Sequence, residues 1–228
     1  AFDPATLEEK WALIPSLVVP DLVKLANPAY NMQHRFFLDG SPSVGDVYDP
    51  SAGGAAYADR WRTVLVGGLR AGGQGYYALD VTNSQDPKPL WEFSCATAGA
   101  KSDGKCDLGL SFGEPIITKR MEDATDRWVV LVSSGYNSES GKAVLFVLDA
   151  LSGEVLERIA AADSGGTVGA PDDQAGFAAI AAWADDGMRK NRVEYVYGGD
   201  IRGRVWRFKI TKGETGSQLL ARLKDVNG

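Results

Sequence analysis

The sequence carries one pattern three times: a run of branched and aromatic residues, a turn that contains glycine, and a second run of the same kind. In the three copies the first run ends at Gly68, Gly135 and Gly199, at nearly equal spacing. Short apolar runs separated by glycine turns are typical of antiparallel β-strands, and their repetition at a fixed interval is typical of a repeat architecture. The sequence therefore predicts an all-β fold built from similar sheets.

Each copy extends on both sides into further strand-like runs. The runs that we predict to be strands are 43–47, 64–68, 76–81 and 90–93, then 114–118, 130–135, 144–149 and 155–159, and finally 177–181, 195–200 and 205–210. Repeated units of four short antiparallel strands are typical of β-propeller blades, and propellers close with four to eight blades. About three units are present, so we expect a partial ring or a fragment of a larger propeller.

Two regions follow from this pattern. We expect an N-terminal lead-in over 1–35 and the blades over 36–228, as three units at 36–94, 107–160 and 176–212. The lead-in contains apolar residues near helical spacing, interrupted by two prolines, and predicts a short helix from about Pro4 to Leu13 followed by irregular chain. Because the sequence does not begin with Met, we expect a piece of a longer precursor, and a missing signal peptide then says nothing about location.

The composition excludes several classes of protein. The 30 acidic residues outnumber the 24 Lys and Arg residues, for a net charge of −6, which argues against nucleic-acid binding. Hydrophobic residues make up 44% of the chain, as in an ordinary globular protein, yet no apolar run is long enough to span a membrane.

The two cysteines, Cys95 and Cys106, are separated by a small, polar, glycine-containing segment. Such a segment lets the two sulfurs meet, and the disulfide would stabilise the fold by about 3 kcal/mol through loop closure. We expect this disulfide and, with it, an extracytoplasmic location. The alternative is a pair of unpaired thiols in a cytosolic protein.

Several longer stretches point to one family. They are 36–46, 61–69, 72–82, 107–115, 134–143 and 199–208. Together they resemble the C-terminal propeller of the PilY family, the type IV pilus tip-associated adhesin and biogenesis proteins that include the neisserial PilC relatives. The resemblance covers about 11–210. It implies an exported protein at the pilus tip, outer membrane surface or periplasm that supports pilus assembly, opposes retraction and contributes to attachment without catalysis. Its implied partners are minor pilins or other tip components and a host or abiotic surface.

The family also carries a calcium loop of the form Asp-x-Asp/Asn-x-Asp-x-x-x-Asp, which this resemblance places at 186–194. Asp186 and Glu194 keep carboxylates at the first and last positions, but Met188 and Lys190 supply no side-chain oxygen at the third and fifth. Calcium prefers several oxygen ligands. We therefore expect a degenerate site without calcium, in which the Lys190 ammonium pairs with both carboxylates.

Two alternatives remain open for this loop. It is either a plain solvated turn, or a distorted calcium site completed by Asp185 or Asn191. In the absence of calcium, the family's calcium control of retraction would not operate through this loop, and no other cofactor is expected.

Two catalytic signatures lack their structural context. The stretch 109–113 matches G-x-S-x-G, but a predicted strand follows it instead of the helix that a nucleophile elbow requires. The single histidine, His34, lies in a polar stretch without a marked acidic partner, so we expect a structural role for it. The stretch 73–78 fits a relaxed dinucleotide fingerprint, but it too leads into a strand, so we expect a turn there.

A further resemblance supports the propeller. The stretch 148–156 is similar to the blade-docking repeat of quinoprotein dehydrogenases, with a looser copy at Leu79, Asp80 and Trp91. In those enzymes the Asp and Gly fix a turn and the Trp packs between blades, so the repeat does not imply a quinone cofactor. Their disulfide between adjacent cysteines is absent here. The rival functions are a quinoprotein-like oxidoreductase, which cofactor absorbance would reveal, and a structural scaffold domain of another secreted protein.

Overall fold

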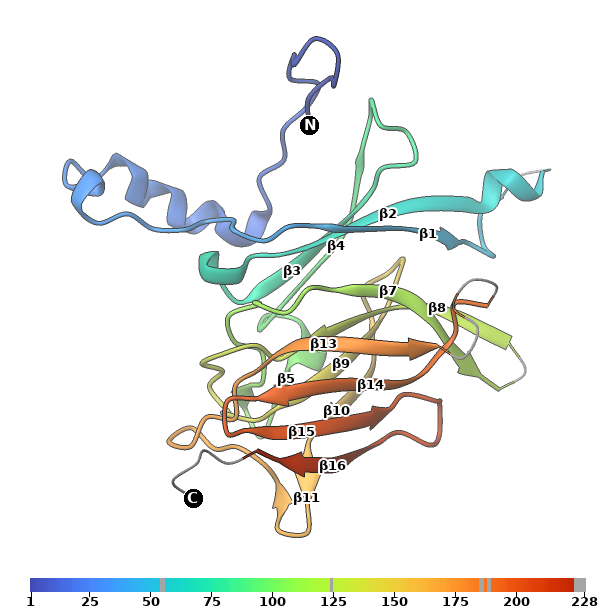
Figure 1. Cartoon of the computed structure of the whole chain (residues 1–228). Helices are drawn as coiled ribbons and strands as arrows, with labels where there is room; N and C mark the ends of the chain where they lie inside the picture. Colours follow the sequence, from blue (N-terminus) through green and yellow to red (C-terminus); the bar gives the residue numbers. More distant parts are fainter. Residues whose placement is uncertain (54–55, 124, 185–186, 188–189, 224–228) are drawn as a thin grey trace.

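The computed structural model describes residues 1–53, 56–123, 125–184, 187 and 190–223 (Figure 1). Within them lie three four-stranded antiparallel sheets, each made of strands consecutive in sequence. The first sheet contains β1 (Ser43–Tyr48), β2 (Trp61–Gly68), β3 (Gly75–Asp80) and β4 (Lys88–Ser94). The second contains β7 (Ile116–Glu122), β8 (Thr125–Ser133), β9 (Val144–Asp149) and β10 (Val155–Ala160). The third contains β13 (Phe177–Ala184), β14 (Val193–Asp200), β15 (Arg204–Lys209) and β16 (Gly216–Arg222).

Smaller elements join the sheets. Two short hairpins follow the first and second sheets, β5 (Lys101–Ser102) with β6 (Lys105–Cys106), and β11 (Ala162–Asp163) with β12 (Gly166–Thr167). The 3-10 helices are η1 (Ser16–Ala26), η2 (Tyr30–Met32), η3 (Tyr57–Arg60), η4 (Arg70–Gly72) and η5 (Ala98–Ala100). None of the helices in the described part of the chain is long and apolar enough to cross a membrane.

The three sheets pack face to face through two continuous apolar cores. One core joins the first and second sheets, and its buried side chains include Val64, Val66, Phe93, Val130, Val132 and Phe146. The other joins the second and third sheets and includes Leu131, Leu145, Val147, Phe177, Trp206 and Phe208. The second sheet therefore buries both faces, which explains why its two central strands are continuously apolar over 128–132 and 144–148. This stack of four-stranded blades confirms the predicted all-β propeller architecture.

The turn after β9 shows how two blades lock together. Asp149 Oδ1 accepts hydrogen bonds from the backbone N–H groups of Leu151 and Ser152, at 3.0 and 2.8 Å, and Gly153 completes the turn with a φ of +71°. Trp91 of the first sheet packs on this turn, and its indole Nε1 donates to the carbonyl of Ala150 at 3.0 Å. The expected roles of the repeat, a turn fixed by Asp and Gly and a Trp between blades, are thus confirmed.

The N-terminal segment departs from the prediction. The helix expected over Pro4–Leu13 is wrong: Phe2 pairs with Glu9 in a β-bridge, and the chain becomes helical only in η1, after Pro15. Of the apolar side chains that suggested a helix, Trp11, Leu17 and Val18 instead cover the outer face of the first sheet. Leu7 and Ile14 are exposed. Tertiary burial on the sheet replaces the amphipathic α-helix that the spacing suggested.

The third sheet holds a strand that the sequence pattern does not predict. Its fourth strand, β16, pairs with β15 from Arg204 opposite Arg222 to Lys209 opposite Gly216. The third blade therefore has the same number of strands as the first two.

Candidate functional site

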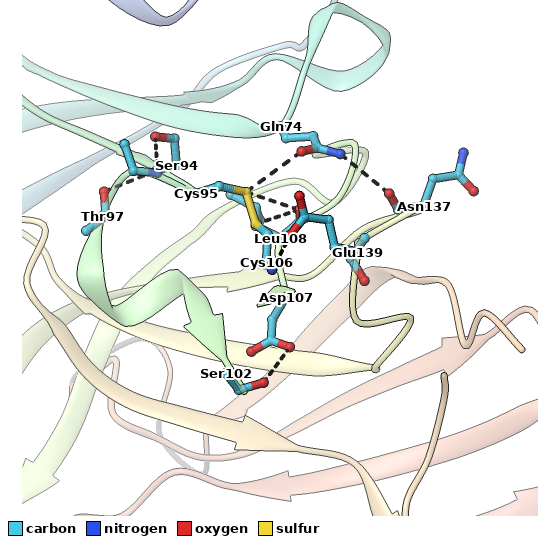
Figure 2. Close-up of a disulfide and its surroundings, with 12 residues drawn as sticks. Gln74, Ser94, Cys95, Thr97, Ser102, Cys106, Asp107, Leu108, Asn137 and Glu139 are labelled. Carbon is cyan, nitrogen blue, oxygen red and sulfur yellow. Dashed lines mark hydrogen bonds between the residues drawn. A yellow bond between two sulfur atoms is a disulfide. The ribbon is translucent and has the colours of Figure 1, made fainter. Parts of the chain in front are cut away.

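The disulfide between Cys95 and Cys106 is formed, as predicted (Figure 2). Cys95 lies directly after β4 and Cys106 in β6, with Cα atoms 5.6 Å apart, so the bridge encloses η5 and the β5–β6 hairpin. Cys106 is almost fully buried, and its backbone N–H donates to Glu139 Oε2 at 2.7 Å. The bridge therefore closes an insertion between the first and second blades.

A buried ion pair fastens this insertion to the second blade. The side chain of Asp107 is fully buried, and Arg158 of β10 binds it through Nε at 2.5 Å and also through Nη2. Ser102 Oγ donates to Asp107 Oδ1 at 2.9 Å and accepts from Arg158 Nη2 at 2.8 Å. Because every one of these groups has a partner, the ion pair forms a clamp, that is, a contact that holds the hairpin against the second blade in one defined arrangement.

The exposed tip of the same hairpin has an additional contact. Lys142 Nζ donates to Asp103 Oδ2 at 2.9 Å and to Ser102 Oγ at 3.2 Å. This hydrogen bond to Lys142 lowers the pKa of Asp103. Disulfide, buried ion pair and tip contact together make the 95–107 insertion a fixed part of the surface. The cysteines were visible in the sequence, whereas the Asp107–Arg158 pair had no local signal there.

A second set of charges lies on the second blade. Arg120 of β7 is buried, and its guanidinium contacts Glu122 Oε1 at 2.5 Å and Glu157 Oε1 at 3.3 Å. Arg127 Nε, from β8, lies 2.9 Å from Asp149 Oδ2. Burial raises the pKa of Glu122, but the hydrogen bond and charge of Arg120 outweigh it, so the net pKa is lowered.

The predicted calcium loop lies at one end of the third sheet. Asp186, Met188 and Asp185 fall outside the described residues. Glu194 is the second residue of β14, and its Oε1 lies 3.5 Å from Lys209 Nζ. The hydrogen bond to Glu214 raises the pKa of Lys209.

The surroundings of Glu194 are rich in cations. A cavity of about 210 Å³ beside it is lined by Lys190, Arg192 and Lys209, among other residues. Asn191, the possible replacement ligand, lies between blades: its Oδ1 is 3.2 Å from Thr118 Oγ1, and its carbonyl accepts from Thr118 Oγ1 at 2.9 Å. In the part of the loop that the structure describes, the carboxylate of Glu194 thus lies next to a lysine, and the side chain of Asn191 is hydrogen-bonded to Thr118.

The described residues contain no group of three or more His, Cys, Asp or Glu side chains that could hold a metal ion.

Ser111 and His34, the two residues that a catalytic reading of the sequence would use, have structural partners. Ser111, the serine of G-x-S-x-G, is buried, and its Oγ accepts the backbone N–H of Leu69 at 2.9 Å and donates to the carbonyl of Gly75 at 2.8 Å. His34 is exposed and packs against the rings of Tyr30 and Phe36, at centroid distances of 5.9 and 5.0 Å. The stretch 73–78 leads into β3, a strand, as expected.

Comparisons with known proteins agree with this architecture. Residues 1–223 match the family model described as the PilY1 beta-propeller domain. The chain is 36% identical over 207 residues to the type IV pilus biogenesis factor PilY1 of Pseudomonas aeruginosa, an alignment that covers 90% of this chain and 16% of that protein. It is 32% identical over 211 residues to a PilY1 homolog of Xylella fastidiosa, with 89% of this chain and 13% of the homolog covered. The chain thus spans less than a fifth of the length of these relatives.

The fold is also similar to a solved structure. The crystal structure of the Pseudomonas aeruginosa PilY1 C-terminal domain superposes with a TM-score of 0.65 and 30% sequence identity. The superposition covers 91% of this chain but 36% of that domain.

Proposed function

Because the chain belongs to the PilY1 β-propeller domain family, we propose that it is a non-enzymatic propeller module of a type IV pilus biogenesis and tip-adhesin protein. In this role it supports pilus assembly or retraction control and contributes to surface attachment. The observation that carries the proposal is the family match over 1–223, which contains all three blades. The chemistry of such a module is that of a rigid surface, since the blades and the clamped 95–107 insertion hold their loops in fixed positions.

The disulfide supports the proposed location. Disulfides persist in oxidising compartments, and Cys95–Cys106 fastens an insertion that the second blade also holds. An exported protein at the pilus tip, the outer membrane surface or in the periplasm fits this chemistry. Minor pilins or other tip components, and a host or abiotic surface, are the proposed partners.

We also propose that the 186–194 loop acts without calcium. The carboxylate of Glu194 lies next to Lys209, and Lys190 and Arg192 line the same cavity. These cations oppose a divalent ion where the resemblance places the family's calcium loop. Any control of retraction by this protein then works through another element.

The experiment that tests the function uses pilus display in the native host. A strain without the full-length protein is complemented with the intact protein or with one that lacks residues 1–223 of this chain, and surface pili are counted. We expect the intact protein to restore pili and the shortened protein to fail at equal protein levels. Full restoration by the shortened protein would refute the proposal.

The same strains without a working retraction motor separate the two roles. If pili return in the absence of the protein, the module acts by opposing retraction. If pili remain absent, it acts in assembly.

A further inference from the structure

Four aromatic rings form a continuous row at one end of the first two blades. Tyr48 and Tyr57 stack with their centroids 5.3 Å apart, and Trp61 meets both edge-on, at 5.5 and 6.2 Å. Trp128 of the second blade continues the row, 6.0 Å from Trp61. We call these four residues the aromatic row. In Figure 1 the loop after β1 and the β7–β8 hairpin lie at the same end of the molecule, on the right of the view.

The row is open to solvent. Tyr57 is 67% exposed, and the other three rings are partly exposed. The first two blades already pack together here, with Trp128 at the border of their common core, so blade packing leaves the row uncovered. The loop that carries Tyr57 spans 49–60, whereas residues 123–124 alone join β7 and β8. Extra chain at a hairpin end of a rigid sheet is a common place for binding residues.

Hydrogen bonding separates the tryptophans of the row from those that pack inside the fold. In three of the other tryptophans the indole N–H donates to a protein oxygen: Trp11, Trp91 and Trp206. The indole N–H groups of Trp61 and Trp128 donate to none of the described residues. Tryptophan that is buried for structural reasons normally satisfies this group. Two donors are therefore available to a ligand that lies along the row.

The spacing of the rings restricts the shape of that ligand. An aromatic cage that holds a cation needs open space between its ring faces. The rings of Tyr48, Tyr57 and Trp61 touch one another, at centroid distances of 5.3 to 6.2 Å, so no group fits between them. A ligand must instead lie on top of the row, with a flat apolar face against the rings.

The charges that border the row are of both signs. Lys119 Nζ lies 5.4 Å from the centroid of the Trp128 ring and 3.7 Å from Asp126 Oδ2. Arg60 Nη1 donates to the hydroxyl of Tyr48 at 3.3 Å. A ligand with a net charge would be repelled by one of these signs. Hydroxyl groups suit both, since they donate to a carboxylate and accept from a cation.

We propose that the aromatic row binds a neutral carbohydrate chain, with the C–H faces of its sugar rings on Tyr57 and Trp61. A sugar ring combines an apolar C–H face with hydroxyl groups that donate and accept, as the row and its border require. A proline-rich peptide also lies flat on aromatic surfaces, but it presents carbonyl acceptors and no comparable donors for Asp126. The inference deepens the attachment role proposed above, on which it rests for its biological meaning.

The first test measures binding by the full-length protein. Cellohexaose, chitohexaose and mannohexaose are titrated separately, with tryptophan fluorescence and calorimetry as readouts. We expect at least one of them to bind, and Tyr57→Ala to raise its dissociation constant about tenfold. Tyr57→Phe, which keeps the ring face, should bind as the natural protein does. An absence of binding to all three, or equal binding by the natural protein and Tyr57→Ala, would overturn the proposal.

Phe36→Ala is the matched control. Phe36 is also an exposed ring, but it precedes β1, and its neighbour Phe37 lies against Gly72 at the other end of the first sheet. We expect Phe36→Ala to bind like the natural protein. Equal losses in Phe36→Ala and Tyr57→Ala would refute the location. If Tyr57→Ala does not fold, Tyr57→Leu replaces it with the same expectation, since it fills similar space without a ring face.

A second measurement separates the classes of ligand. Binding of a neutral oligosaccharide should be the same at low and high salt, because no ion pair forms. Decaproline and heparin are titrated under the same conditions. Tighter binding of decaproline that depends on Tyr57 would assign the row to a polypeptide, and tighter, salt-sensitive binding of heparin would assign it to a polyanion. Either result would refute the proposal.

This test and the pilus complementation fail independently of each other. Tyr57→Ala changes one exposed ring, so we expect it to restore surface pili as the intact protein does. If no carbohydrate binds while the protein without residues 1–223 still fails to restore pili, only the carbohydrate site is wrong. If that shortened protein restores pili, the proposed function is wrong whatever the row binds.

Discussion

Trp91 and Gly153, which belong to adjacent blades, lie in such close contact that a Cβ atom on Gly153 would stand 2.5 Å from the indole ring. The glycine also has a φ of +71°, which L side chains adopt only with strain. Both the conformation and the space at this position therefore require glycine. The contact joins the turn of one blade to the tryptophan of the other.

The first prediction uses this contact. Gly153→Ala should destabilise the protein by about 3 kcal/mol or more, since backbone strain and overpacking against Trp91 add together. Gly104→Ala is the matched control: Gly104 has a φ of +74° but nothing within 4 Å of a built Cβ, so we expect a loss of about 1 kcal/mol. Urea unfolding midpoints measure both. Equal losses would show that the contact with Trp91 adds nothing to the strain.

The second prediction concerns the clamp between the hairpin and the second blade. Arg158→Ala leaves the Asp107 carboxylate buried without its cation, and we expect a loss of about 3 kcal/mol or more. The double variant Arg158→Ala with Asp107→Asn removes the uncompensated charge and should recover part of that stability. Chemical denaturation of the single and double variants checks this. A double variant less stable than Arg158→Ala would contradict the account.

The third prediction concerns the disulfide. Replacing both cysteines, Cys95→Ser with Cys106→Ser, should lower the free energy of unfolding by about 3 kcal/mol because the unfolded chain regains its loop entropy. Dithiothreitol should lower the stability of the natural protein by a similar amount and leave the serine variant unchanged. Thermal melts with and without the reductant provide the readout, and a reductant effect on the serine variant would place the sensitivity elsewhere.

The fourth prediction concerns acid. The pKa values of Glu122 and Asp149 are lowered in the folded protein, against the effect of burial, by Arg120 and by the backbone N–H of Ser152 respectively. The two carboxylates therefore make their full contribution to the free energy of unfolding above the unfolded pKa values, near 4. This contribution is lost as the pH falls through the lower pKa values of the folded protein. We expect the melting temperature to fall steeply below about pH 4 for this reason.

A matched pair of variants isolates this effect. Glu122→Gln should lose stability at neutral pH and show a smaller further loss between about pH 6 and pH 3. Glu114→Gln, at an exposed position without an ion pair among the described residues, should follow the natural protein. Parallel acid profiles for Glu122→Gln and the natural protein would argue against the assignment.

The fifth prediction concerns calcium. Thermal melts of the natural protein with excess Ca²⁺ and with EGTA should superimpose. The rebuilt loop, Met188→Asn with Lys190→Asp, should gain about 2.7 kcal/mol at a hundredfold excess of Ca²⁺ over its dissociation constant. Calorimetry supplies an independent measure of binding. A calcium-dependent shift in the natural protein would restore calcium control as the leading mechanism, and an absence of heat with the rebuilt loop would refute the ligand assignment.

The strands were predictable where burial dictated residue type. The run 144–149 is buried on both faces and coincides with β9, because a central strand must be apolar throughout. In contrast, β16 contains Ser217, Gln218 and Arg222 and presents one face to solvent. Its pairing with β15, and not its composition, therefore makes it a strand.

The sequence predicts the disulfide of the candidate site but not its long-range ion pair. The two cysteines predicted their own pairing, since a short polar segment separates them. Asp107 and Arg158 are far apart in sequence, and their ion pair depends on how the second blade folds back on the insertion. The N-terminal apolar residues suggested a helix by spacing alone, but packing on the first sheet replaced it with an extended segment and η1. Such long-range contacts leave no periodic signal in the sequence.

The disulfide has a mechanical consequence when the chain is placed under tension. When the two ends of the chain are pulled apart, the force passes from Cys95 to Cys106 through the sulfur bridge, across Cα atoms 5.6 Å apart. The 11 peptide units between them would otherwise extend to about 37 Å. The covalent bridge keeps the β5–β6 hairpin outside the line of force, so this length cannot be drawn out of the junction between the first two blades.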